Sequence, residues 1–379
     1  MKRKLYGSLL VFFILFQLFP SAAEAAPFEV SGKGAVLIEA ESGRVLYEKN
    51  KDQQMRIASI TKIMTAIIAI ESGKLDETVK VSGNAAYTEG SSLYLKPGEN
   101  IKLEDLVFGL MLRSGNDSAV AIAEHVGGSL DGFVFLMNEK AQEIGMTNTR
   151  FANPHGLDDH EEHYSTAYDM ALLTKYAMKN EKYQEVAGTK TYRASQEGED
   201  WDRVWSNKNR LLTQLYEYCT GGKTGYTKRA GRTLVTTAEK DDMSLIAVTI
   251  NAPSDWNDHI KMYEWTFENY DMEVLAKEGL LKETDDPFYE KKVLIPYTYR
   301  YPLTEEEKRN VKQQIVLYEP PSEERADSYI PPQPVGKLEY SLNGEPFHAI
   351  ALYFKRDTSS DKEEGFWAKL RGLYRALSE

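Results

Sequence analysis

The sequence has little cysteine, little basic charge and few long apolar runs. Cys219 is the single cysteine, so no disulfide can form within the chain and no thiolate metal cluster can be built. Acidic residues (58) outnumber basic ones (46), and this balance argues against binding to nucleic acid, which relies on basic charge. Hydrophobic residues make up 42% of the chain, which excludes a wholly disordered protein. At about 150 residues per domain, 379 residues predict two to three domains.

The one long apolar run lies at the N-terminus, from Leu5 to Phe19. Basic residues precede it, and Ala23-Glu24-Ala25 fits an A-x-A cleavage site, which together predict a secretory signal peptide over residues 1–25. An uncleaved membrane anchor is the alternative, although the run is shorter than the ~20 residues of a spanning helix. We therefore expect a protein that is secreted across the cytoplasmic membrane.

Residues 27–272 are predicted to form one α+β domain. Strand-like runs lie at both of its ends, and the segments between them carry apolar residues at helical spacing. We expect the terminal strands to be neighbours in one antiparallel sheet against which the helices pack. The expected strands are 35–40, 44–48, 233–238 and 245–251, and the expected helices begin at 59, 103, 117 and 166. Asp117 is expected to cap the third of these helices.

A small all-β domain is predicted over residues 280–356, where short strands and a strong hairpin signal, Asn343-Gly344, replace the helical pattern. Residues 361–379 are predicted to form an amphipathic helix that lies on a membrane surface. Its apolar face comprises Phe366, Trp367, Leu370, Leu373, Tyr374 and Leu377, and its cationic flanks are Lys369, Arg371 and Arg375. A helix packed on the β domain is the alternative that periodicity leaves open.

Ser59 and Lys62 stand one helical turn apart at the start of the most apolar predicted helix, so the ammonium group can reach the hydroxyl. Burial lowers the pKa of a lysine toward the range in which it acts as a base. A serine hydroxyl is a poor nucleophile until a base takes its proton. The spacing alone is weak evidence, because Ser359 and Lys362 repeat it in a polar tail, and a plain helix cap at Ser59 is the alternative.

Two further motifs point to the same chemistry. Ser114-Gly115-Asn116 falls in the predicted turn between the second and third helices, where both polar side chains can face a cleft. Lys223-Thr224-Gly225 is the one K-T-G in the chain and precedes the paired strands. S-x-N also occurs at 82–84 and 341–343, and spacing alone does not choose among the three. S-x-x-K, S-x-N and K-T-G in this order are typical of β-lactamases and penicillin-binding proteins.

On these motifs the chain resembles the low-molecular-mass penicillin-binding proteins that are serine D-alanyl-D-alanine carboxypeptidases. Residues 57–66 are similar to the nucleophile helix of that family, residues 111–125 to its second motif, and Asn153–Leu157 and Lys223–Thr227 to further landmarks. The resemblance is strong over residues 27–272 and weaker over the β domain and the C-terminal tail. It implies a serine β-lactamase/DD-peptidase-like α+β fold, an antiparallel sheet with helices on both sides, plus the small β domain. It implies neither a cofactor nor a metal.

The resemblance also implies an activity: hydrolysis of the terminal D-alanyl-D-alanine bond of peptidoglycan stem peptides through an acyl-enzyme, with β-lactam antibiotics as inhibitors. The enzyme would be attached peripherally to the outer face of the membrane. The implied catalytic residues are Ser59 as nucleophile, Lys62 as general base and Ser114 as proton relay.

The implied substrate-binding residues are Asn116 for the amide, Lys223 and Thr224 for the terminal carboxylate, Gly225 for close approach of the substrate, and Tyr226. The backbone N–H of Tyr226 would form the oxyanion hole with that of Ser59. Lys208 stands where the family often has a carboxylate-binding arginine, so the way in which the carboxylate is held stays open.

The sequence is also compatible with three other kinds of enzyme site and with a non-catalytic protein. A β-lactamase would share the chemistry, but glycine replaces aspartate in the second motif and E-x-x-L-N is absent. A zinc peptidase could use His155, His160 and His163, but H-E-x-x-H is absent and a solvated loop is expected there. Cys219 could be a nucleophile, although lone cysteines are commonly buried and inert. A non-catalytic wall-binding protein would not be labelled covalently by a penicillin.

Overall fold

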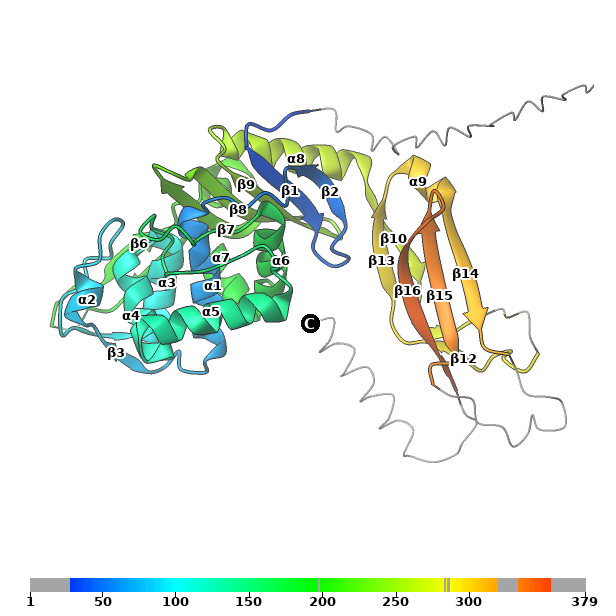
Figure 1. The fold of residues 1–379 in the computed structure, drawn as a ribbon, viewed down its shortest axis with the longest axis horizontal. Helices are drawn as coiled ribbons and strands as arrows, with labels where there is room; N and C mark the ends of the chain where they lie inside the picture. The colour runs from blue at the N-terminus through cyan, green and yellow to red at the C-terminus, as the bar shows by residue number, and fades with distance from the viewer. Residues whose placement is uncertain (1–27, 197, 283, 285–286, 320–332, 356–379) are drawn as a thin grey trace, which may run out of the picture.

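The computed structural model describes residues 28–355 apart from 197, 283, 285–286 and 320–332 (Figure 1). The signal peptide predicted over residues 1–25 and the amphipathic helix predicted over 361–379 lie outside the described residues. Among the described residues, no single helix is long and apolar enough to span a membrane. The pair α4 (Asn116–Gly127) and α5 (Leu130–Ile144), bent by 85°, passes that test by length and composition alone.

A five-stranded antiparallel sheet forms the centre of the first domain, in the order β2-β1-β9-β8-β7. The strands are β1 (Gly34–Glu39), β2 (Val45–Lys49), β7 (Cys219–Thr227), β8 (Gly231–Lys240) and β9 (Met243–Ile250). The first strand pairs with the last along its whole length, from Gly34 opposite Ile250 to Glu39 opposite Leu245. The prediction that strands from the two ends of this domain are neighbours is confirmed.

Helices cover both faces of this sheet, because successive side chains of a strand point to opposite faces. Val36 and Ile38 of β1 belong to the larger core with the helices α1, α3, α4, α5, α6 and α7. Ala35 and Leu37, one position along, belong to a second core with α8. The helices are α1 (Lys62–Glu71), α2 (Gly83–Ala86), α3 (Leu103–Arg113), α4 (Asn116–Gly127), α5 (Leu130–Ile144), α6 (Ala167–Ala177), α7 (Glu181–Gly188) and α8 (Asp255–Asn269). The predicted fold class is therefore confirmed.

Local differences from the sequence prediction are informative. Ser59 lies in a 3₁₀ turn, Ala58–Thr61, and the α-helix begins only at Lys62. Asp117 is not the cap of α4: Gly115 is the N-cap, and the Asp117 carboxylate binds backbone N–H groups of a different segment. Short elements also precede and follow the helices, namely the strand pairs β3 (Thr78–Lys80) with β4 (Asn100–Lys102) and β5 (Thr191–Ala194) with β6 (Arg203–Ser206), and a π-helical turn at Leu211–Leu215.

The C-terminal β domain is built from two antiparallel sheets in the orders β11-β12-β16-β15-β14 and β10-β13. Its elements are β10 (Asp271–Ala276), β11 (Gly279–Leu280), β12 (Val293–Ile295), β13 (Tyr299–Leu303), α9 (Glu305–Asn310), β14 (Val311–Leu317), β15 (Gly336–Leu342) and β16 (Glu345–Phe354). Asn343 and Gly344 both adopt a positive φ and join β15 to β16. These are the conformations of a type I′ hairpin turn, as Asn-Gly predicts.

Arg44, at the turn between β1 and β2, holds the β domain against the first domain. Its guanidinium donates to the carbonyl of Pro302 and to both carboxylate oxygens of Glu307. The same group lies 5.3 and 5.0 Å from the ring centroids of Tyr270 and Tyr301. Planar recognition of a carboxylate together with stacking on aromatic rings is a role that lysine does not fill. Figure 1 shows the β domain beside β2, at the end of the molecule away from α2 and β3.

We expect Arg44→Ala to lower the free energy of unfolding by about 1–3 kcal/mol, because Glu307 loses its partner at a largely buried position. Thermal unfolding and limited proteolysis near residue 270 would measure the effect. Arg150→Ala is the matched control: its pair with Glu162 is largely exposed, so a change within about 0.5 kcal/mol is expected. Equal effects of the two substitutions would contradict the role of Arg44.

Candidate active site

Lys62 is completely buried at the first turn of α1, and its amine has three partners. The Nζ atom lies 3.1 Å from Ser59 Oγ, 2.7 Å from Asn116 Oδ1 and 2.7 Å from the carbonyl oxygen of His155. Burial, followed by the charges of Lys223 and Lys208, holds the pKa of Lys62 well below the ordinary lysine value. A neutral amine can donate to the two carbonyl-type oxygens and direct its lone pair to the hydroxyl of Ser59, so this geometry suits a base.

The turn that carries Ser59 is constrained on both sides. Ala58 adopts φ +50°, a conformation that is unusual for a residue with a side chain and that clusters at functional sites. Thr233 of β8 donates from Oγ1 to the carbonyl of Ile57 at 2.9 Å, and Thr61 Oγ1 donates to the carbonyl of Ala58 at 2.8 Å. These bonds hold the turn, and with it Ser59, in place just before the first residue of α1.

Ser114 and Lys223 form the second half of the site. Ser114 ends α3 in the left-handed conformation, at φ +65°, and its side chain is buried. Lys223 Nζ donates to Ser114 Oγ at 3.1 Å and to the carbonyl of Thr224 at 2.8 Å. Burial and the charge of Lys208 lower the pKa of Lys223 to about 7. Asn116, two residues further on, accepts from Lys62. The turn Ser114–Asn116 therefore contacts both Lys62 and Lys223.

Gly225 allows the edge strand β7 to pass close to the serine. A Cβ at this position would lie 2.9 Å from the backbone nitrogen of Ser59 and 2.4 Å from Thr233 Oγ1, contacts too short for a side chain. Thr224 and Gly225 are partly buried, whereas the side chain of Tyr226 is exposed. β7 is the last strand of its sheet, so its outer edge has no strand partner among the described residues, and an edge of this kind can pair with an extended peptide.

The structure also chooses among the repeated motifs. Ser82 is the N-cap of α2 and accepts from Ala85 N, and Ser341 lies in β15 of the other domain. Of the three S-x-N sequences, Ser114-Gly115-Asn116 is therefore the one that meets Lys62 and Lys223. The second S-x-x-K, Ser359 to Lys362, lies outside the described residues.

Sequence reasoning gave no role to two groups at this site. The carbonyl of His155 accepts from Lys62, and the carbonyl of Pro154 accepts from Thr65 Oγ1 at 2.6 Å. Gly156, at φ +88°, brings this segment to the nucleophile turn: a Cβ there would lie 1.9 Å from the carbonyl oxygen of Ala58. The signal was the N-P-H-G-L sequence, whose glycine marks a close backbone approach.

The candidate zinc ligands do not form a solvated loop throughout, and that part of the prediction is wrong. His155 and His163 are buried, and burial lowers the pKa of each to about 3, so both are neutral. His163 Nε2 lies 2.8 Å from Thr61 Oγ1, whereas His160 is exposed. Within the described part of the chain, no three His, Cys, Asp or Glu side chains are grouped as metal ligands. Burial raises the pKa of the Cys219 thiol to about 11, which disfavours the nucleophilic thiolate.

Comparison with known proteins agrees with this geometry. Residues 21–254 match the family described as D-alanyl-D-alanine carboxypeptidase. The D-alanyl-D-alanine carboxypeptidase DacF of Bacillus subtilis is 38% identical over 290 residues, which cover 73% of this chain and 74% of the relative. DacC of Escherichia coli is 35% identical over 280 residues, covering 70% and 68%. The crystal structure of penicillin binding protein 5 from Haemophilus influenzae matches with a TM-score of 0.73 at 26% identity, covering 88% of this chain and 99% of that chain.

The fold, with a serine and a buried lysine in contact, defines the class of serine enzymes that penicillins acylate. The chain belongs to the D-alanyl-D-alanine carboxypeptidase family. It is a serine-type enzyme that hydrolyses the terminal D-alanyl-D-alanine bond of peptidoglycan pentapeptides through an acyl-enzyme, which trims stem peptides and limits cross-linking. Penicillins acylate it covalently. The family and activity implied by the sequence are confirmed, and the extracytoplasmic substrate is consistent with the predicted export.

Proposed function

We propose that Ser59 is the nucleophile of this carboxypeptidase and that Lys62 is its general base. The supporting observation is that Lys62 Nζ is buried, 3.1 Å from Ser59 Oγ, with its other contacts made to two oxygens that carry no proton. Lys62 takes the proton of Ser59 as Oγ attacks the carbonyl carbon of the penultimate D-alanine. The oxyanion then accepts hydrogen bonds from the backbone N–H groups of Ser59 and Tyr226.

Ser114 relays the proton held by Lys62 to the nitrogen of the departing D-alanine, and the carbon–nitrogen bond breaks to leave the acyl group on Ser59 and a neutral Lys62. A water molecule then attacks the ester, Lys62 takes a proton from that water, and the same proton passes to Ser59 Oγ as the ester bond breaks, which restores the hydroxyl. Asn116 binds an amide of the substrate, and Gly225 gives its backbone room beside β7.

The terminal carboxylate of the substrate faces Lys223 and Thr224. Lys208 adds positive charge there, and its charge contributes to the lowered pKa of both Lys62 and Lys223. A lysine is a point charge and binds a carboxylate without the two-pronged geometry of arginine. The site therefore holds the carboxylate mainly by electrostatic attraction.

The chain is further proposed to divide into a signal peptide at 1–25, the catalytic domain at 27–272, the β domain at 280–356 and an amphipathic helix at 361–379. Pairing of β10 with β13 adds residues from Asp271 onward to the β domain. After export the enzyme is attached peripherally to the outer face of the cytoplasmic membrane through this helix. The alternating apolar and cationic residues of 366–377 support that attachment.

Ending the chain at Glu364 is expected to move the enzyme from the membrane fraction to the soluble fraction, because the apolar face of residues 366–377 is then lost. Cell fractionation, with the signal peptide shown by mass to be removed, measures this. In the full chain, the double variant Leu370→Asp/Leu373→Asp should also move to the soluble fraction. The control Glu364→Gln lies outside the apolar face and should stay in the membrane fraction. A shortened chain that stays as membrane-bound as the full chain would exclude the helix as the anchor.

A further inference from the structure

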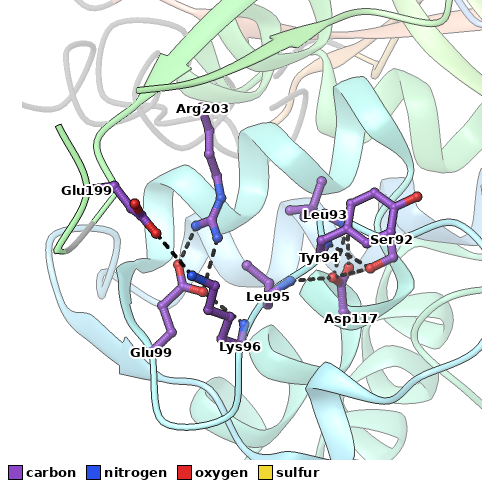
Figure 2. A network of polar contacts seen from close by, with 9 residues as sticks. All are labelled: Ser92, Leu93, Tyr94, Leu95, Lys96, Glu99, Asp117, Glu199 and Arg203. Atoms are coloured by element: carbon purple, nitrogen blue, oxygen red, sulfur yellow. Dashed lines mark hydrogen bonds and ion pairs between the residues drawn. The ribbon is translucent and has the colours of Figure 1, made fainter. Parts of the chain in front are cut away.

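Asp117 fixes the segment of chain that borders Asn116. Its carboxylate is buried and accepts from Leu93 N at 3.0 and 2.9 Å, from Leu95 N at 3.2 Å and from Ser92 Oγ at 2.7 Å. Figure 2 shows the carboxylate at the centre of these contacts. Hydrogen bonds to a buried carboxylate are stronger than those between neutral groups. The backbone from residue 92 to residue 95 is therefore held rigidly.

Tyr94 adopts an unusual backbone conformation as a result. Two backbone N–H groups, those of Leu93 and Leu95, point at the same carboxylate, and the residue between them has φ +60°. Concave arrangements of this kind bind anions, and glycine adopts the required conformation without strain. The tyrosine ring instead projects outward and is 84% exposed, so it contributes little to packing. Strained conformations of bulky residues cluster at functional sites.

The segment that carries Tyr94 is part of the wall of the active site. Asn116 N donates to the carbonyl of Ser91 at 2.7 Å, and Asn116 Nδ2 donates to the carbonyl of Glu89 at 2.6 Å. Leu93 packs on the motif itself: a Cβ at Gly115 would lie 2.7 Å from Leu93 Cγ. Tyr94 therefore directly follows Leu93, which contacts the Ser114–Asn116 turn.

The far end of the segment is fixed as well. Lys96 Nζ lies 3.1 Å from the carboxylate of Glu199, and Arg203 binds both carboxylate oxygens of Glu99. Figure 2 shows these ion pairs beyond Leu95, on the same stretch of chain. The aromatic ring is therefore presented by a backbone that is held at both ends. A rigid ring with few rotatable bonds gives contact area at a low cost in conformational entropy.

We propose that Tyr94 is a specificity-determining residue that contacts the stem peptide on the amino-terminal side of the two D-alanines. The proposal rests on the proposed function, in which Asn116 binds a substrate amide and Lys223, across the site, faces the terminal carboxylate. The substrate chain leaves the site on the side of Asn116, where the face of the Tyr94 ring can pack against its aliphatic part. Binding energy from this remote part of a substrate accelerates its reaction, and a truncated substrate lacks it.

The test compares two substrates, a stem pentapeptide and an N-acetylated D-alanyl-D-alanine dipeptide. In Tyr94→Ala and Tyr94→Gly, kcat/KM for the pentapeptide is expected to fall roughly tenfold, while kcat/KM for the dipeptide stays unchanged. Tyr94→Phe should retain the wild-type preference. The glycine variant adopts the positive φ without strain, so folding is not in question. Phe135→Ala on α5 is the matched control, a 62% exposed ring expected to alter neither substrate.

An equal loss for both substrates would overturn the proposal, because Tyr94 would then act through the position of Asn116. No loss for either substrate would overturn it as well. Failure of the proposed function gives a different result: a Ser59→Ala enzyme that still hydrolyses the dipeptide.

Discussion

Replacing Ser59 by alanine is expected to abolish release of D-alanine from a stem pentapeptide. No acyl-enzyme can form without the hydroxyl, and removal of a catalytic nucleophile lowers kcat by a factor of at least about 10⁴. The fold should persist, because the constraints on this turn come from Thr233 and Thr61, not from the Ser59 side chain. Measuring released D-alanine with the purified variant, beside its thermal unfolding curve, checks both statements.

Ser359→Ala is the matched control for this experiment. Ser359 precedes a lysine with the same S-x-x-K spacing but stands in a polar stretch of sequence. The control variant should release D-alanine at the wild-type rate. A folded Ser59→Ala protein with near wild-type activity would refute the assignment of the nucleophile.

Lys62→Arg is expected to slow acylation by a penicillin by a factor of about 10²–10⁴. An arginine stays protonated at any pH compatible with the fold, so it cannot take the proton of Ser59. In the wild type, acylation should be lost as the pH falls through the lowered pKa of Lys62, because only the neutral amine is a base. Stopped-flow or gel measurement of acylation across a pH series reports both effects.

Two variants accompany that measurement. Lys62→Met keeps a similar volume without a base and should be as slow as Lys62→Arg, which separates loss of the base from a charge effect. Lys80→Arg, at an exposed position of β3, should acylate at the wild-type rate. An arginine variant that acylates at near wild-type rate would rule out Lys62 as the general base.

The sequence alone was enough to predict the main helices and strands of the catalytic domain. The apolar stripe from Ile60 to Ile68 predicts a buried helix. Ser59 and Lys62 are three positions apart at its start, so their contact follows from the local backbone geometry. Asn343-Gly344 predicts its turn for the same reason, since the backbone conformation depends on those two residues alone. Patterns that are local in sequence gave predictions that the structure confirms.

α8 was missed because polar residues are mixed into its buried face. Asp255, Asp258, His259 and Thr266 are buried there beside Met262 and Tyr263, so they interrupt the run of apolar residues that marks a helix in the sequence. Three of these polar groups have distant partners: His259 bonds Thr236 and Thr249, Asp258 binds Ser31 at the other end of the domain, and Asp255 binds Arg232. Such contacts exist only in the folded chain.

The site shows the same limit. Asp117 fits the sequence pattern of a helix cap, yet its carboxylate binds the backbone of residues 93–95, more than twenty positions earlier. The contact of Lys223 with Ser114 spans 109 positions, and the carbonyl of His155 reaches Lys62 across 93. A backbone carbonyl has no sequence signature, so its role at Lys62 could be found only from the fold.

The most direct test of the central claim is to locate the adduct left by a penicillin. Benzylpenicillin opens its β-lactam ring on the nucleophile and adds its whole mass, since no group leaves. Trypsin releases residues 57–62 between Arg56 and Lys62, and fragmentation of that peptide distinguishes Ser59 from Thr61. We expect one adduct, on Ser59. An adduct on Ser114 or on any other residue, or an unmodified protein, would contradict it.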